Sequence, residues 1–199
     1  MRKPTLGRVH SPGLLRSFVE HLRGREQTLI RSPEPWPLLL LSYPTGSGAI
    51  AGEVRDAWLH TLPSLRAPVV APYLDMMSRL PTIVVVQLRP YNICTCLGHH
   101  HPAGTESRLA RSLASDLGGR LGEIDLAWEA IRRWRPHPLR TTAAESLAGF
   151  EHSHFRTALL TVLLHELEHL AYPDHQERSV RGASDEFYTQ VLEELLSLA

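Results

Sequence analysis

The sequence predicts an α+β fold, in which a small mixed sheet packs through its edge strand on one long helix, after a mainly helical N-terminal extension. Residues 81–88, PTIVVVQL, form a β-branched run that begins at a proline, which is typical of a buried strand. Residues 121–128 alternate between two faces, as a half-buried strand does. Residues 155–164 are apolar almost all round, which indicates a helix in the core. With 199 residues the chain can form one sizeable core, so we expect a single domain.

Residues 1–80 are expected to form the N-terminal extension. Apolar side chains at helical spacing predict helices over residues 12–26, 52–62 and 72–80. Residues 36–43 are flanked by prolines and are typical of a strand. The glycines of residues 44–48 are not followed by the Lys-Ser/Thr pair of a phosphate-binding loop, so we interpret this stretch as a linker.

Residues 81–199 are expected to form the core. Beyond the strands, leucines at helical spacing predict a surface helix over residues 106–117, which Gly118 and Gly119 close. A short helix over residues 128–134 should end at the prolines that follow it. Ser184 is a plausible N-cap for a final helix over residues 187–198.

The buried helix ends in the pattern H-E-x-x-H, formed by His165, Glu166 and His169. Histidines four residues apart project from one face of a helix, one turn from each other, which is half of a zinc site. A catalytic zinc takes three protein ligands and keeps a fourth position for water. His175 is the nearest further donor, and Pro173 should end the helix so that the chain can fold back. We therefore predict a Zn²⁺ site made by the three histidines.

Two other interpretations of this stretch remain open. A random chain of this composition would contain the pattern with a probability of roughly one in twenty, so the histidines could be incidental at a solvated helix end. Alternatively, an acidic residue could complete the site, and the candidates are Asp174, Asp185 and Glu186. Polar groups at the end of a buried helix cost desolvation unless something binds them, which favours a metal.

The segment from Cys94 to His101 is dense in ligand-type side chains. Cys94 and Cys96 are too close in sequence for an easy disulfide, so we expect both to be reduced. The segment is predicted to be an exposed loop beside the active cleft. A second metal site is the alternative, as is a latent state in which one of these side chains takes the open zinc position.

Composition restricts the partners of the chain. Its net charge is zero, so there is no overall attraction for nucleic acid or anionic lipid. The longest apolar run, residues 37–43, is far too short to cross a bilayer. The N-terminus lacks the apolar segment of a secretory signal, so we expect a cytoplasmic protein.

These residues together resemble the zincin peptidases, and among them the SprT-like, YgjP-like and WLM group. The resemblance covers roughly residues 81–199. It comprises the Gly-containing turn 94–98, the edge strand 122–128, the helix motif HELEHL at 165–170, the third histidine His175 and the aromatic-bearing segment 185–188. Metzincins are set aside because Tyr172 stands where they have glycine and no methionine follows Met77. Residues 1–80 have no counterpart in this group.

The resemblance implies a zincin-like catalytic core and a zinc-dependent metallopeptidase acting on a protein or peptide. The residues support the same chemistry, since zinc lowers the pKa of a bound water towards about 7 and Glu166 can take its proton. The strand near residues 123–127 could pair with an extended substrate. Oxyanion-stabilising candidates are Tyr172, Tyr188, His152 and His154. The alternative is an inactive, zinc-stabilised protein-binding module with a fourth protein ligand.

Overall fold

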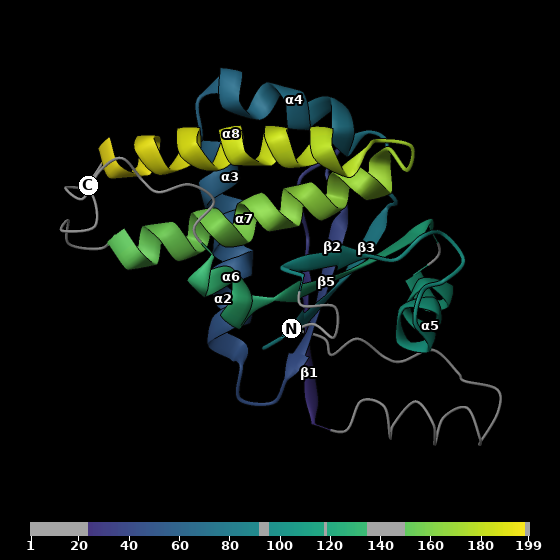
Figure 1. Ribbon diagram of the computed structural model, residues 1–199. Coiled ribbons are helices and arrows are strands. Elements are labelled where there is room, and N and C mark those ends of the chain that lie inside the picture. Colours follow the sequence, from purple (N-terminus) through teal and green to yellow (C-terminus); the bar gives the residue numbers. More distant parts are fainter. Residues whose placement is uncertain (1–23, 92–95, 118, 135–149, 198–199) are drawn as a thin grey trace.

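A computed structural model of the chain describes residues 24–91, 96–117, 119–134 and 150–197. It contains one five-stranded mixed sheet between two helical layers of unequal size (Figure 1). The larger layer contains the long helices α7 (Phe150–Ala171) and α8 (Glu177–Ser197), which lie side by side. Helix α5 (Arg108–Leu117) lies on the other face of the sheet. The α+β class predicted from the sequence is confirmed.

The strands are β1 (Arg25–Ile30), β2 (Leu38–Pro44), β3 (Ile83–Arg89), β4 (Gly98–His100) and β5 (Leu121–Ala127). Their order in the sheet is β1-β2-β3-β5-β4. The three central strands run parallel, and β1 and β4 add antiparallel strands at the two edges. The edge strand expected at residues 122–128 is therefore an internal strand. The edge beside α7 is instead β4, whose three residues were predicted as part of a loop.

The N-terminal part of the chain is built into the same sheet. Strand β2 confirms the strand expected at residues 36–43, and it pairs with β3 from Leu38 opposite Ile83 to Ser42 opposite Gln87. The expected extension is thus not an appendage to a core that starts at residue 81. Residues 25 and 26 belong to β1, and the rest of the helix predicted at 12–26 lies outside the described residues except for Gly24, which forms a turn.

The remaining helices connect these strands. They are α2 (Gly48–Asp56), the π-helical turn η1 (Ala57–Thr61), α3 (Leu62–Ser64), α4 (Ala67–Met77) and α6 (Trp128–Arg133). Helices α2 to α4 cover the two helices expected before residue 80. Helix α8 begins at Glu177, so the prediction of a final helix starting after Ser184 was wrong. The first turns of α8 are polar on every side but one, and only Val180 and Ser184 are buried there.

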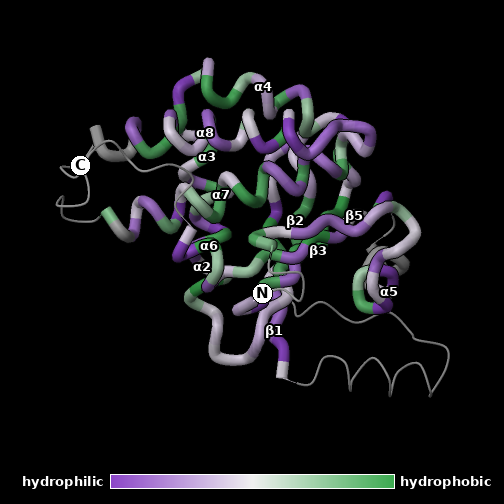
Figure 2. The backbone as a smooth tube through the Cα atoms, viewed as in Figure 1, coloured by the Kyte–Doolittle hydropathy of each residue, from purple (hydrophilic) through white to green (hydrophobic). Residues whose placement is uncertain are grey.

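The main core lies between the sheet and α7. Apolar residues are concentrated on β2, β3 and the inner turns of α7 (Figure 2), and most of the exposed residues of α8 are polar. A Cβ on Gly122 of β5 would come within 2.9 Å of Leu170 Cδ1, so this glycine lets α7 approach the sheet closely. Tyr73 of α4 packs edge-on against Phe187 of α8, with ring centroids 4.9 Å apart, and burial raises the pKa of its hydroxyl. None of the described helices combines the length and apolar character needed to cross a membrane.

Candidate metal centre

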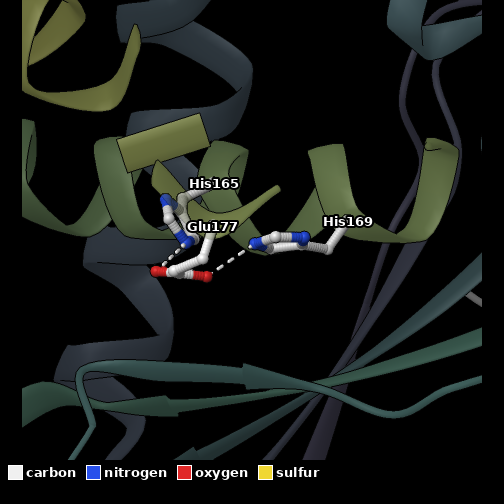
Figure 3. Close-up of side chains that lie close together, drawn as sticks. All are labelled: His165, His169 and Glu177. Carbon is white, nitrogen blue, oxygen red and sulfur yellow. Dashed lines mark hydrogen bonds and ion pairs between the residues drawn. The ribbon is translucent and has the colours of Figure 1, made fainter. Parts of the chain in front are cut away.

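Three side chains converge where α7 passes the start of α8 (Figure 3). His165 and His169 come from successive turns of α7, and both direct Nε2 toward the carboxylate of Glu177. The distances are 3.4 Å from His165 Nε2 to Oε1 and 3.0 Å from His169 Nε2 to Oε2. One ligand atom from each side chain lies within 4.8 Å of the others, a spacing at which all three can bind one metal ion. Two imidazoles and a carboxylate match a set of protein ligands known for catalytic zinc.

The connection between α7 and α8 places Glu177 in this group. Helix α7 ends at Ala171, as Pro173 predicted, and a short turn reverses the chain. Glu177 is the first residue of α8, where the partial positive charge of a helix N-terminus favours a carboxylate. Its side chain is 71% exposed, whereas that of His169 is 7% exposed. The group therefore combines a buried imidazole with a carboxylate that is open to solvent.

His175, the predicted third ligand, does not join this group. Its Nδ1 lies 3.1 Å from Glu168 Oε1, and its ring stacks on Tyr172 with centroids 4.5 Å apart. The Tyr172 hydroxyl donates a hydrogen bond to Asp75, and Arg79 Cζ lies over the Tyr172 ring, 5.0 Å from its centroid. His175 thus stabilises the turn between α7 and α8. The carboxylate of Glu177 lies beside His165 and His169 instead.

The acidic alternatives to His175 also lie elsewhere. Asp174 is exposed in the turn, and Glu186 accepts a hydrogen bond from Gln190 on the surface of α8. Asp185 lines the cavity beside the centre but does not belong to the group of three. The sequence analysis considered an acidic third ligand as an alternative, but Glu177 was not among its candidates. The signal was a carboxylate eight residues after the second histidine, on what proved to be the first turn of a helix.

A hydroxyl group fixes the orientation of His165. Ser184 Oγ donates its hydrogen to the carbonyl of Val180, 2.9 Å away, so it can only accept from His165 Nδ1 at 3.0 Å. Nδ1 therefore carries the proton of the neutral ring, and the lone pair is on Nε2, the atom that faces Glu177. Such outer hydrogen bonds orient metal-binding histidines and set their tautomer. Ser184, expected to be an N-cap, instead supports the centre from inside α8.

Glu166 lies between α7 and the edge strand β4. It is buried, and its Oε2 is 3.5 Å from Nδ1 of His100. A Cβ on Gly98 would be 2.4 Å from Glu166 Oε1, so only glycine leaves room for this carboxylate. The His100 ring also stacks on His169, with centroids 4.7 Å apart. Strand β4 thus holds both the carboxylate and one of the candidate ligands in place.

A cavity of about 380 Å³ opens beside these groups. Its lining residues are Cys96, Leu97, Gly98, Trp134, Thr161, Val162, His165, Glu166, Glu177, Arg181, Ser184 and Asp185. Because Glu166 and two members of the candidate metal group face the same space, a molecule in the cavity could contact all of them.

The segment before and within β4 differs from its predicted state. Cys96 is disulfide-bonded, so the expectation of reduced cysteines was wrong; Cys94 lies outside the described residues. A disulfide sulfur does not offer the thiolate that zinc binds. His101 pairs with Asp125 at 3.1 Å, and the rings of His99 and His100 stack. Within the described residues none of these three histidines belongs to the metal group, which gives no support to a second site or to a latent state made by their rings.

The four oxyanion candidates from the sequence do not line the cavity. His154 and Tyr188 are buried and hydrogen-bonded to each other. His152 is exposed near Glu53, and Tyr172 belongs to the turn.

The chain matches no protein-family model, no curated protein and no solved structure.

Proposed function

We propose that the protein is a zinc-dependent metallopeptidase. The observation that carries this proposal is the convergence of His165, His169 and Glu177 beside a cavity that Glu166 also lines. Zinc sites with two histidines and one glutamate are found in hydrolytic enzymes, and the H-E-x-x-H pattern adds a second carboxylate next to a ligand. A zinc ion held there would supply Lewis-acid activation of a water molecule and of the scissile carbonyl.

Glu166 has the position that a general base requires. It follows His165 directly, faces the cavity and has one carboxylate oxygen near His100. In the proposed reaction this carboxylate accepts a proton from the attacking water and delivers it to the leaving amine. His100 and the absence of a side chain at Gly98 hold the carboxylate beside α7. These contacts support the proposal that the Glu166 carboxylate is held in one position from which it can act as a base.

Strand β4 offers a binding edge for an extended peptide. The bonds His101 N–H to Glu123 O and Ala127 N–H to Leu97 O direct the odd-numbered residues of this segment toward β5. In an antiparallel pair the alternate residues point their backbone groups away, so Gly98 and His100 present N–H and C=O to the open edge. A substrate strand could bind these groups and run past the cavity. The strand addition expected at residues 123–127 is therefore proposed for β4.

The alternative, a zinc-stabilised module without activity, predicts a closed site. A structural zinc has four protein ligands. In the described part of the chain the candidate group has three members, and Glu166 would have no role in a structural site. Both features favour an enzyme with one position left for water.

The test replaces Glu166 by glutamine, which keeps shape but removes the base. Glu166→Gln is expected to bind zinc as the wild type does and to lose at least about a hundredfold in kcat/KM on an unfolded protein or peptide substrate. The matched control is Glu168→Gln, on the same helix but paired with His175. Activity of Glu166→Gln near that of wild type, or no zinc-dependent hydrolysis by the wild type, would contradict the proposed function.

A further inference from the structure

The lining of the cavity beside the candidate metal centre includes two chemically different sets of residues. His165, Glu177 and Glu166 belong to the candidate centre. The second set, which we call the apolar side, consists of Leu97 before β4, Trp134 at the end of α6, and Thr161 and Val162 of α7, one helical turn before His165 and Glu166. Three separate segments thus contribute to the apolar wall, and Val162 and Thr161 are buried members of α7.

The two hydroxyl groups in the lining, those of Thr161 and Ser184, already have hydrogen-bond partners. Thr161 donates its hydroxyl hydrogen to the carbonyl of Thr157 at 2.8 Å, so it offers the cavity little beyond its methyl group. The hydroxyl of Ser184 is used by Val180 and His165. A ligand group entering this side would therefore meet hydrocarbon and the Trp134 ring, with few polar partners. Binding pockets of this kind gain affinity from apolar contact.

Two further charges lie on α8 at the cavity. Arg181 is exposed and Asp185 is half-buried, one helical turn further along. Their charges are opposite, so together they give no net preference for an acidic or a basic side chain. A preference for an acidic or a basic substrate side chain would require Arg181 without Asp185, or Asp185 without Arg181.

We propose that the apolar side of this cavity is a specificity pocket for one large apolar or aromatic side chain, on a residue next to the scissile bond. This inference rests on the proposed function, because it concerns the same centre. The volume of about 380 Å³ lies within the range of roughly 300–1,000 Å³ typical of ligand pockets. It can hold one large side chain together with the reacting groups. Trp134 adds an aromatic ring to the lining, and aromatic side chains pack favourably with one another.

The experiment compares peptides that differ at one position. A set of fluorogenic peptides carries Phe, Leu, Ala, Asp or Lys at each position flanking the cleaved bond, and kcat/KM is measured with zinc-loaded protein. We expect Phe and Leu to exceed Ala by at least about 30-fold at one position, because a single methylene group in an apolar pocket is already worth roughly 10–200-fold. Equal rates for Phe and Ala, or a preference for Asp through Arg181, would overturn the inference.

Variants of the wall assign the preference to this cavity. Trp134→Ala is expected to lower the Phe-to-Ala ratio at least fivefold, while Trp134→Phe retains most of it. Leu97→Ala gives a second test that is independent of the contact between Trp134 and Tyr188. Leu74→Ala, on the exposed side of α4, is the control and should keep the ratio unchanged. An unchanged ratio in both Trp134→Ala and Leu97→Ala, with zinc still bound, would contradict the proposal.

A second readout separates the inference from the proposed function. Phenylalanine hydroxamate and alanine hydroxamate share a zinc-binding group and differ only in the side chain, and calorimetry measures their dissociation constants for the zinc-loaded protein. Tighter binding of the phenylalanine compound by at least tenfold supports the pocket even if no peptide is cleaved. A difference below tenfold overturns the pocket, whether or not peptides are cleaved.

Discussion

Glu177 and His175 are two residues apart but have different surroundings, and this gives a matched pair of variants. Glu177→Ala removes a carboxylate that faces both candidate histidines, so zinc affinity should fall at least about a hundredfold. His175→Ala removes a stacking and ion-pair contact in the turn, so zinc affinity should change by less than about threefold. Competition with a chromophoric chelator measures both affinities. Weaker binding in His175→Ala than in Glu177→Ala would return His175 to the ligand set.

Ser184 gives the second prediction at the residue scale. Ser184→Ala leaves the Nδ1 hydrogen of His165 without its acceptor, so the ring can rotate or change tautomer. Loss of such an outer contact typically costs about 10- to 100-fold in metal affinity. Ser179→Ala is the control, because the Ser179 side chain is exposed on α8 and its hydroxyl donates a hydrogen bond to the carbonyl of Gln176, away from the candidate centre. Equal zinc affinity in the two variants would exclude an orienting role for Ser184.

At the scale of elements, the contact between β4 and α7 depends on Gly98. A methyl group there would lie 2.6 Å from Glu166 Cγ as well as 2.4 Å from Oε1, which is too close for either atom to stay in place. We expect Gly98→Ala to retain the fold and to lose at least about a hundredfold in peptidase activity, through displacement of the base. Circular dichroism and steady-state kinetics measure the two effects.

Gly182 of α8 is the matched glycine. Nothing lies within 4 Å of a Cβ built on it, and it is inside a helix. Gly182→Ala should therefore raise the free energy of unfolding by about 0.5–1 kcal/mol and leave activity unchanged. Full activity in Gly98→Ala would show that the carboxylate has another position from which it can act.

The elements also show what sequence patterns can and cannot predict. The run IVVV around residue 84 and the apolar stretch 155–164 define a strand and a helix because burial of their side chains determines their structure. Strand β4 has only three residues and includes two histidines, so no periodicity distinguishes it from a loop. The start of α8 is polar on its exposed faces, and packing against α7 stabilises it. Tertiary contacts, which no local pattern contains, fix both of these elements.

At the scale of the whole molecule, zinc should contribute to stability, because the metal binds only the folded arrangement of the three side chains. Free zinc at a thousand times its dissociation constant adds about 4 kcal/mol. For a domain of this size that corresponds to a rise of roughly 8–16 °C in Tm. Calorimetry with zinc and with EDTA measures the difference. Equal Tm values would contradict a metal centre in the folded protein.

The candidate site was only partly predictable. His165, Glu166 and His169 lie on one helix, so their spacing alone places them together. The third member depends on how the chain turns after Ala171, and several donors lie within reach in the sequence. The stacking of His175 on Tyr172 and the early start of α8 decide between them. Both are properties of the folded connection, which explains why the sequence favoured His175.

All three candidate ligands lie within residues 165–177, a single hairpin of two helices. A metal ion bound there would act as a local cross-link, since it joins the first residue of α8 to α7 without involving the sheet. Its effect on dynamics should therefore be regional: amide hydrogens in the first turns of α8 should exchange more slowly when zinc is present, while those of β2 and β3 change much less. The hairpin closes over the short connection 172–176, whereas the parallel strands pair residues that are far apart in the chain, so metal capture could precede completion of the parallel sheet during folding.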